Sequence, residues 1–181
     1  SIPVETIRQI QQSCVEHDDD MRWLIALISD TGMRLAEAAG LHVNDIKLDE
    51  DIPYVDIKPH PWRSLKTKGS QRQVPLVGAS LWAAQRIKAN TSSCFAFPRY
   101  TDNSRCNANS ASNALNKWLH ANFRSDIVIH GFRHAMRDRL RAVSCPSEMI
   151  DQIGGWSERS IGEGYGEGFT AQQKHNMISQ I

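Results

Sequence analysis

The stretch HGFRHAMRDRLRAV, residues 130–143, predicts one helix with a basic face. Positions three and four apart lie on the same side of a helix, so the imidazole of His130 and the guanidinium of Arg133 can reach one small anion. Arg137 and Arg141 continue that side at four-residue steps. For this helix alone an ordinary solvated basic surface is the commoner case, so an anion site needs support from the rest of the chain.

Helical spacing of apolar residues recurs on both sides of this stretch, and three short segments rich in β-branched residues interrupt it. A basic turn, KTKGS at residues 66–70, precedes the last of these segments. We therefore expect a mainly α fold with a small three-stranded antiparallel β-sheet, an α+β class. The expected helices are residues 3–16, 21–28, 34–39, 79–90, 109–122, 130–143, 146–153 and 170–180, and the expected strands are residues 43–48, 53–57 and 72–76.

The composition is typical of a globular protein, with 181 residues of which 40% are hydrophobic and 23% charged. A chain of this length can bury a core without disulfides or metal. Its longest apolar run, Trp23 to Ile28, is far shorter than the ~20 residues that cross a bilayer, so no membrane span is expected. The four cysteines form no C-x-x-C pair, which favours a reducing, cytoplasmic setting. Because the first residue is Ser rather than Met, we expect a further domain upstream.

The charge is divided unevenly along the chain. Residues 1–56 hold 12 acids and 4 bases, a balance of −8, whereas residues 57–181 hold 17 bases and 8 acids, a balance of +9. Such asymmetry suggests that one face meets a polyanion, although solvated surface charge is an equal alternative on this evidence alone.

Thr31-Gly32 ends one predicted helix and lets the next begin at once, which places Arg34 in the first turn of the new helix. An anion there would meet both the guanidinium and the helix N-terminus. Glu37, one turn later, can hold the guanidinium in orientation. The alternative is an exposed ion pair, which is worth only ~0.2–0.5 kcal/mol.

Gly154-Gly155-Trp156 precedes a second glycine-rich segment, GEGYGEG at residues 162–168, which contains Tyr165. Four glycines at alternating positions disfavour a helix, since each costs ~1 kcal/mol relative to Ala. The spacing is not G-x-G-x-x-G and no strand is predicted before it, which excludes a dinucleotide-binding fingerprint. Tyr165 is therefore either an ordinary loop aromatic or a functional side chain.

Taken in order, these features resemble the catalytic domain of the tyrosine recombinases, the phage integrase family. That family carries an Arg after T-G-x, a Lys in a β-turn before a V-P-L-like strand, an H-x-x-R pair, and a Tyr nine residues after a G-H or G-W step. The resemblance implies that residues 1–181 form a tyrosine recombinase catalytic-domain fold, with the family's N-terminal core-binding domain absent from this chain. The matching positions are Arg34, Lys68 or Lys66, His130, Arg133, Trp156 and Tyr165.

The resemblance implies a site-specific recombinase that breaks and rejoins DNA. Tyr165 would attack a phosphodiester and form a 3′-phosphotyrosyl link with release of a 5′-hydroxyl, without a metal or another cofactor. Arg34 and Arg133 would hold the non-bridging oxygens, since a guanidinium stays ionised and donates in a fork. The sequence agrees in offering no acidic cluster of the two-metal type.

Three further roles would complete such a site. The pKa of a tyrosine is about 10, so Tyr165 needs a base, and His130 is the candidate. A lysine in the turn would protonate the leaving 5′-oxygen. Lys68 is favoured by the K-G pair that precedes the turn, while Lys66 stays open. Trp156 stands where His is commoner in the family, so it would offer an indole N–H to the phosphate in place of a titratable ring.

The resemblance also implies partners. These are double-stranded DNA and a homo-oligomer, the synaptic tetramer on DNA, with accessory DNA-bending proteins as further candidates. Residues 170–181 resemble the family's C-terminal tail, which docks on a neighbouring protomer. Two alternatives stay open: a type IB topoisomerase-like enzyme, which uses similar residues to relax supercoils, and a catalytically inactive DNA-binding module of the same fold.

Overall fold

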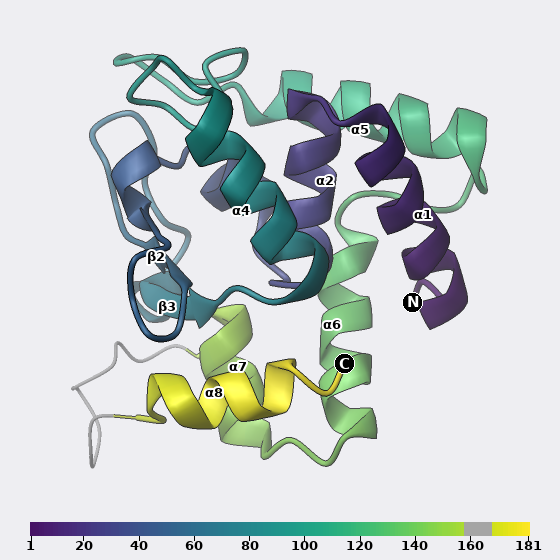
Figure 1. Ribbon diagram of the computed structural model, residues 1–181, viewed down its shortest axis with the longest axis vertical. Helices are drawn as coiled ribbons and strands as arrows, with labels where there is room; N and C mark the ends of the chain where they lie inside the picture. Colours follow the sequence, from purple (N-terminus) through teal and green to yellow (C-terminus); the bar gives the residue numbers. More distant parts are fainter. Residues whose placement is uncertain (158–167) are drawn as a thin grey trace.

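The computed structural model describes residues 1–157 and 168–181, where a small sheet lies at one side of a helical body (Figure 1). The strands are antiparallel in the order β1-β2-β3. This confirms the predicted mainly α fold with a three-stranded antiparallel sheet. The helices are α1 (Val4–His17), α2 (Asp20–Ser29), α3 (Leu35–Ala39), α4 (Gly78–Asn90), α5 (Ala108–Asn122), α6 (Gly131–Ala142), α7 (Ser147–Gly154) and α8 (Ala171–Ile178). The strands are β1 (Ile46–Lys47), β2 (Tyr54–Ile57) and β3 (Arg72–Pro75), and the 3-10 turns are η1 (Val43–Asp45) and η2 (Lys68–Ser70).

The first strand is shorter than the residues 43–48 that their β-branched side chains predict. Val43–Asp45 form the turn η1 instead, and only Ile46–Lys47 pair with β2. The turn closes because the Asp45 carboxylate accepts the backbone N–H of His42 at 3.0 Å. Such local side chain to backbone bonds compete with a strand ladder, and here the local bond prevails.

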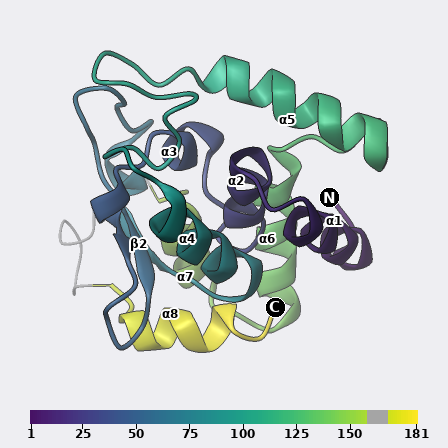
Figure 2. The same ribbon diagram turned by 45° about the horizontal axis from the view of Figure 1, so that its top comes forward.

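Helix α2 forms the centre of the core. All residues from 24 to 29 are buried, so apolar side chains face neighbours around the whole helix. α1, α3, α4 and α6 all contact it, and Figure 2 shows α2 lying among them. The break predicted at Thr31-Gly32 is confirmed, with Gly32 at φ +69°. A Cβ at Gly32 would lie 2.9 Å from Met136 of α6, so glycine also allows the close approach of these two segments.

A buried ion pair ties three helices together at the end of α2. Arg139 of α6 donates from Nη2 to the Asp30 carboxylate at 2.6 Å and from Nη1 to the carbonyl of Ser29 at 2.8 Å. The other Asp30 oxygen accepts the backbone N–H of Ala79, in the first turn of α4, at 2.9 Å. Because removing one partner of a buried pair leaves an uncompensated charge, we assign Arg139 to the fold rather than to an exposed basic face.

The C-terminal helix α8 packs against β3 of its own chain (Figure 1). Ile178 is fully buried there. Lys174, one turn earlier, is 4% exposed, and its Nζ donates to the carbonyl of Gln73 at 2.6 Å. Other apolar side chains of this segment stay partly exposed. Docking of residues 170–181 on a neighbouring protomer stays a prediction.

The substitution Lys174→Met is expected to remove a pH dependence of stability. Burial, followed by the charge of Arg72, lowers the pKa of Lys174 from 10.5 to about 8. Between these values the unfolded chain binds more protons than the folded one, so the unfolding free energy rises with pH, by on the order of 2 kcal/mol. Urea unfolding at about pH 8 and about pH 10 should show this extra rise only with lysine, because methionine does not titrate. If the unfolding free energies of the wild type and of Lys174→Met changed equally with pH, this expectation would be wrong.

Candidate active site

Arg34 lies directly before α3 and is held by three groups. Nη1 donates to Glu37 Oε2 and to Ser70 Oγ, both at 3.1 Å, and Nη2 donates to the carbonyl of Gly155 at 3.0 Å. The backbone N–H of Arg34 donates to Glu37 Oε1 at 2.8 Å, which caps α3. The predicted pairing of Glu37 with this guanidinium is confirmed, and it is not the exposed pair of the alternative: the two side chains are 19% and 3% exposed.

Glu37 also binds a second arginine, Arg72 at the start of β3. Two parallel hydrogen bonds of 2.9 Å join its carboxylate oxygens to Arg72 Nη1 and Nη2. Burial alone would raise the pKa of Glu37, but the charges and hydrogen bonds of Arg72 and Arg34 outweigh it and hold the pKa below its ordinary value. Glu37 is therefore an ionised bridge between the two guanidiniums. Sequence reasoning placed Arg72 in a strand and missed this role, because a single Arg before V-P-L carries no separate signal.

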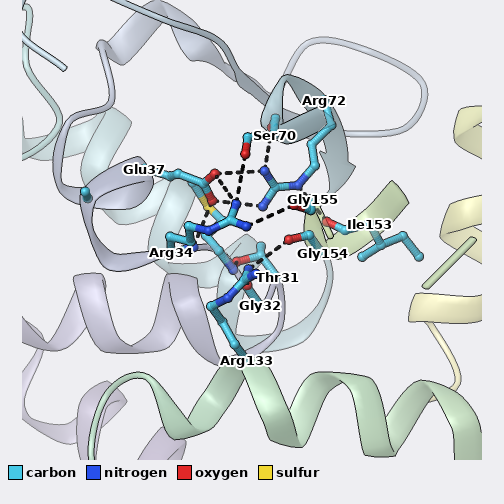
Figure 3. Close-up of polar contacts among 12 residues, drawn as sticks. Thr31, Gly32, Arg34, Glu37, Ser70, Arg72, Arg133, Ile153, Gly154 and Gly155 are labelled. Carbon is cyan, nitrogen blue, oxygen red and sulfur yellow. Dashed lines mark hydrogen bonds and ion pairs between the residues drawn. The ribbon is translucent and has the colours of Figure 1, made fainter. Parts of the chain in front are cut away.

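Three arginines bind three consecutive carbonyls at the end of α7 (Figure 3). Arg72 Nε donates to Ile153 at 2.8 Å, Arg133 Nη1 to Gly154 at 2.9 Å, and Arg34 Nη2 to Gly155 at 3.0 Å. The last carbonyls of a helix lack intrahelical partners and carry partial negative charge, which suits cations.

The glycine at the end of α7 is required by this arrangement. Gly155 has φ +67°, a left-handed conformation that ends the helix. A Cβ there would lie 2.5 Å from Arg72 Nη1. A larger residue would therefore both strain the backbone and push the guanidinium away from Glu37.

Arg133 projects from α6 into the same place. It is 3% exposed, and its Nη1 donates to the carbonyls of Gly32 at 2.6 Å and of Gly154 at 2.9 Å. Burial, followed by the nearby charges of Arg34 and Arg72, lowers its pKa to about 9, so it is still mainly protonated at neutral pH. Among the residues that the structure describes, both of its hydrogen bonds come from Nη1. The Trp156 ring packs on the same guanidinium at 4.5 Å.

His130 is the residue immediately before α6. The helix begins one position later than the predicted helix of residues 130–143. Burial is the first cause that lowers its pKa below the ordinary 6.5, and the charges of Arg133, His134, Arg34 and Lys66 lower it further. At neutral pH the imidazole is therefore uncharged and can accept a proton.

Trp156 covers the end of α7. Its ring lies 4.5 Å from the guanidinium carbon of Arg133 and 4.1 Å from that of Arg137. A Cβ at Gly154 would lie 1.9 Å from the indole, so the first glycine of the Gly-Gly pair makes room for the ring. Trp156 thus packs on two arginines of the predicted basic face, at a distance typical of cation–π contacts.

The two candidate lysines lie in the exposed turn between β2 and β3. Lys66 is close enough to lower the pKa of His130, and Lys68 begins the 3-10 turn η2. The structure therefore brings Lys66 together with four other predicted residues, Arg34, His130, Arg133 and Trp156. Tyr165, the predicted nucleophile, lies outside the described residues.

A cavity of about 240 Å³ adjoins His130 and Arg133. Apolar side chains, among them Met33, line one part of it, and Asn109 and Ser112 from the first turns of α5 line another. A space of this size next to two cationic or proton-accepting groups can hold part of a substrate, with α5 as its far wall.

Many of the bases counted in residues 57–181 are used inside the protein. Among the described residues, five of them are buried and four more are paired with acids at the surface, so fewer positive charges face solvent than the sequence balance of +9 indicates. The difference arises because charge counting cannot tell which arginines fold inward. The buried bases are Arg63, Arg72, Arg133, Arg139 and Lys174, and the surface pairs are Lys58–Asp56, Arg86–Asp18, Arg99–Asp20 and Arg124–Asp126.

Within residues 1–157 and 168–181, no group of three or more His, Cys, Asp or Glu side chains is placed to hold a metal ion. Among the described helices, none has the length and apolar character needed to cross a membrane.

A family model described as the phage integrase family matches residues 2–168 of the chain. No curated protein sequence matches it. Solved structures do match, and among them are complexes of the Tn1549 transposon integrase with DNA.

The complex of that integrase with transposon right end DNA has a TM-score of 0.62 and 15% sequence identity, covering 97% of this chain and 60% of that one. Its complex with circular intermediate DNA has the same TM-score and identity, with 97% and 61% coverage. A variant with a circular intermediate DNA reaches a TM-score of 0.55 at 16% identity, with 86% and 53% coverage. At this identity the likeness shows the fold, and this chain spans about three fifths of the chain length in the first two structures.

Proposed function

This chain belongs to the phage integrase family, and we propose that it is the catalytic domain of a site-specific recombinase that cuts and rejoins double-stranded DNA through a 3′-phosphotyrosyl intermediate. The observation that carries the proposal is the convergence of Arg34 and Arg133, about a hundred positions apart in sequence, on successive carbonyls at the end of α7, with His130 lining the same cavity as Arg133. Cationic side chains held at one point suit a phosphodiester, whose two non-bridging oxygens gain charge in the transition state.

The two arginines are oriented before substrate arrives. Arg34 is fixed by Glu37 and the Gly155 carbonyl, and Arg133 is fixed through Nη1 by the carbonyls of Gly32 and Gly154. Their remaining N–H groups would donate to the non-bridging oxygens of the scissile phosphate. Because protein partners already hold both guanidiniums, little reorganisation is needed at the moment of reaction.

The proton transfers would use His130 and a lysine. Tyr165 Oη would attack phosphorus while the P–O5′ bond breaks; the phenolic proton would pass to the neutral His130, and a lysine ammonium would protonate O5′ and become an amine. The sequence favours Lys68 as that acid, and Lys66, whose charge acts on His130, is the second candidate.

Adduct formation is expected to lose rate in acid with a midpoint below pH 6.5. The pKa of His130 is lowered from 6.5, so the base stays neutral until the pH falls below that value, and protonation then removes it. The rate of covalent adduct formation should be measured against pH for the wild type and for His130→Gln, which should lose this acid limb.

His134→Gln is a directional control for the same experiment. Its ring centroid lies 5.2 Å from that of His130, and its charge contributes to the lowered pKa. Removing it should move the midpoint upward. An acid limb that persists in His130→Gln, or a midpoint above pH 6.5 in the wild type, would exclude His130 as the base.

The direct test of the proposal is a suicide substrate, a DNA duplex nicked beside the cleavage position. The short product diffuses away after cleavage and cannot rejoin, so a covalent protein–DNA adduct accumulates. Trapping at one sequence supports a recombinase, relaxation of supercoiled DNA at many sequences supports the type IB topoisomerase-like alternative, and binding without an adduct supports the inactive module. Assembly of a tetramer on DNA, with residues 170–181 exchanged between protomers, is proposed from the family resemblance.

A further inference from the structure

The buried hydroxyl of Ser70 connects the lysine-bearing turn to Arg34 (Figure 3). Ser70 is fully buried, and its Oγ lies 3.1 Å from Arg34 Nη1, 3.3 Å from the backbone nitrogen of Thr67 and 3.0 Å from Thr67 Oγ1. Thr67 stands between the two candidate lysines, Lys66 and Lys68. One side chain therefore touches both the proposed phosphate-binding arginine and the turn that carries the proposed acid.

The direction of each bond follows from hydrogen-bond capacity. A hydroxyl has one proton to donate and two lone pairs to accept with. Arg34 Nη1 and the Thr67 backbone N–H can only donate, so Ser70 Oγ accepts from both and gives its own proton to Thr67 Oγ1. All three positions of the hydroxyl are thus used, so its removal breaks three hydrogen bonds at once.

The position of the turn depends on the Ser70 hydroxyl more strongly than the position of Arg34 does. Lys66, Thr67 and Lys68 are exposed. Backbone bonds from Ser70 N–H to the Thr67 carbonyl at 3.1 Å and from Gln71 N–H to the Lys68 carbonyl at 3.4 Å shape the turn, and the Ser70 hydroxyl joins it to Arg34. Arg34, by contrast, keeps its bonds to Glu37 and to the Gly155 carbonyl if the serine hydroxyl is removed. Loss of the hydroxyl should therefore displace the lysine while leaving the guanidinium nearly in place.

We propose that Ser70 is a positioning residue that holds the catalytic lysine's turn against the phosphate-binding Arg34. The inference rests on the proposed function, since it assigns Ser70 a part in delivering a proton to the leaving 5′-oxygen. If this is so, substitution of Ser70 impairs protonation of the leaving 5′-oxygen and does not impair binding of the non-bridging phosphate oxygens.

The test uses Ser70→Ala on two suicide substrates, one with the normal 5′-oxygen and one with sulfur in its place. A thiolate leaves without protonation because thiols are far more acidic than alcohols, so a misplaced acid no longer matters. We expect cleavage of the oxygen substrate to slow by about tenfold or more, and cleavage of the sulfur substrate to stay within about twofold of wild type. A purely structural defect would slow both substrates equally.

Reference variants calibrate the result. Lys66→Ala and Lys68→Ala identify the catalytic lysine. Its variant should cleave the oxygen substrate slowly and the sulfur substrate at a rate near that of the wild type. Ser80→Ala is the matched control: Ser80 is also fully buried, and its Oγ also accepts the backbone N–H of the residue three positions earlier, Val77, but it lies at the start of α4, and its hydroxyl bonds with Val77, away from Arg34, Arg133 and His130. It should cleave both substrates at the wild-type rate.

A second measurement follows the link itself. Amide hydrogen exchange at Thr67 should become faster in Ser70→Ala, because its N–H loses the serine acceptor, and should be unchanged in Ser80→Ala. Unchanged exchange at Thr67, equal slowing on both substrates, or full activity of Ser70→Ala would each overturn the inference. If the wild-type chain forms no adduct on either substrate, the proposed function fails, while Thr67 exchange still decides whether Ser70 holds the turn.

Discussion

Tyr165→Phe is expected to abolish the covalent protein–DNA adduct completely while leaving folding and DNA binding unchanged. The substitution removes one oxygen and little packing surface, so only the chemistry of attack should be lost. The nine-residue step from Trp156 to Tyr165 supports this assignment, together with its place after the His130–Arg133 pair. The adduct should be measured by denaturing gel on the nicked substrate, and DNA binding by titration of an intact duplex.

The two other tyrosines supply the controls. Tyr54 is part of β2, and burial followed by the charges of Glu50 and Asp56 raises its pKa. Tyr100 is 6% exposed, and burial raises its pKa too. A phenol that ionises less readily is a poorer nucleophile, so Tyr54→Phe and Tyr100→Phe should retain the adduct. Normal adduct yield from Tyr165→Phe would exclude the mechanism.

Glu37→Ala is expected to destabilise the fold by roughly 3–5 kcal/mol, because it leaves the buried guanidinium of Arg72 without its counter-ion. Arg72 is 2% exposed and makes both of its bonds to acidic oxygens with Glu37. Arg34 would lose its helix cap and one of the groups that orient it, so adduct formation should slow as well. Urea unfolding and adduct kinetics measure the two effects separately.

Glu37→Gln keeps the shape of the side chain and one acceptor oxygen, so its loss of unfolding free energy should be smaller than that of Glu37→Ala. The matched control is Glu16→Ala, in which an exposed glutamate of α1 is removed. Its unfolding free energy should stay within about 0.5 kcal/mol of wild type. If Glu37→Ala behaved like Glu16→Ala, the bridge between Arg34 and Arg72 would have no stabilising role.

Parts of the candidate site were predictable because they depend on short-range geometry. The spacing of His130 and Arg133 places them within one helical turn, and the Thr31-Gly32 break sets Arg34 at the start of a helix. Other parts were not predictable. Ser70 and Arg72 carry no pattern of their own, and the turn at residues 43–45 replaced part of a predicted strand because of a side-chain bond that propensity does not register.

The sequence by itself determined the fold class, the order of the elements, and which residue types could meet a phosphate, because periodicity, helix-ending glycines and motif spacing are local properties of the chain. Only the tertiary structure decided which bases face inward, that Arg34, Arg72 and Arg133 bind successive carbonyls of α7, and that one buried hydroxyl joins Arg34 to the lysine turn. These contacts join segments that are distant in sequence. They form because the core brings α3, β3, α6 and α7 together, and desolvation there makes an unpartnered buried polar group costly.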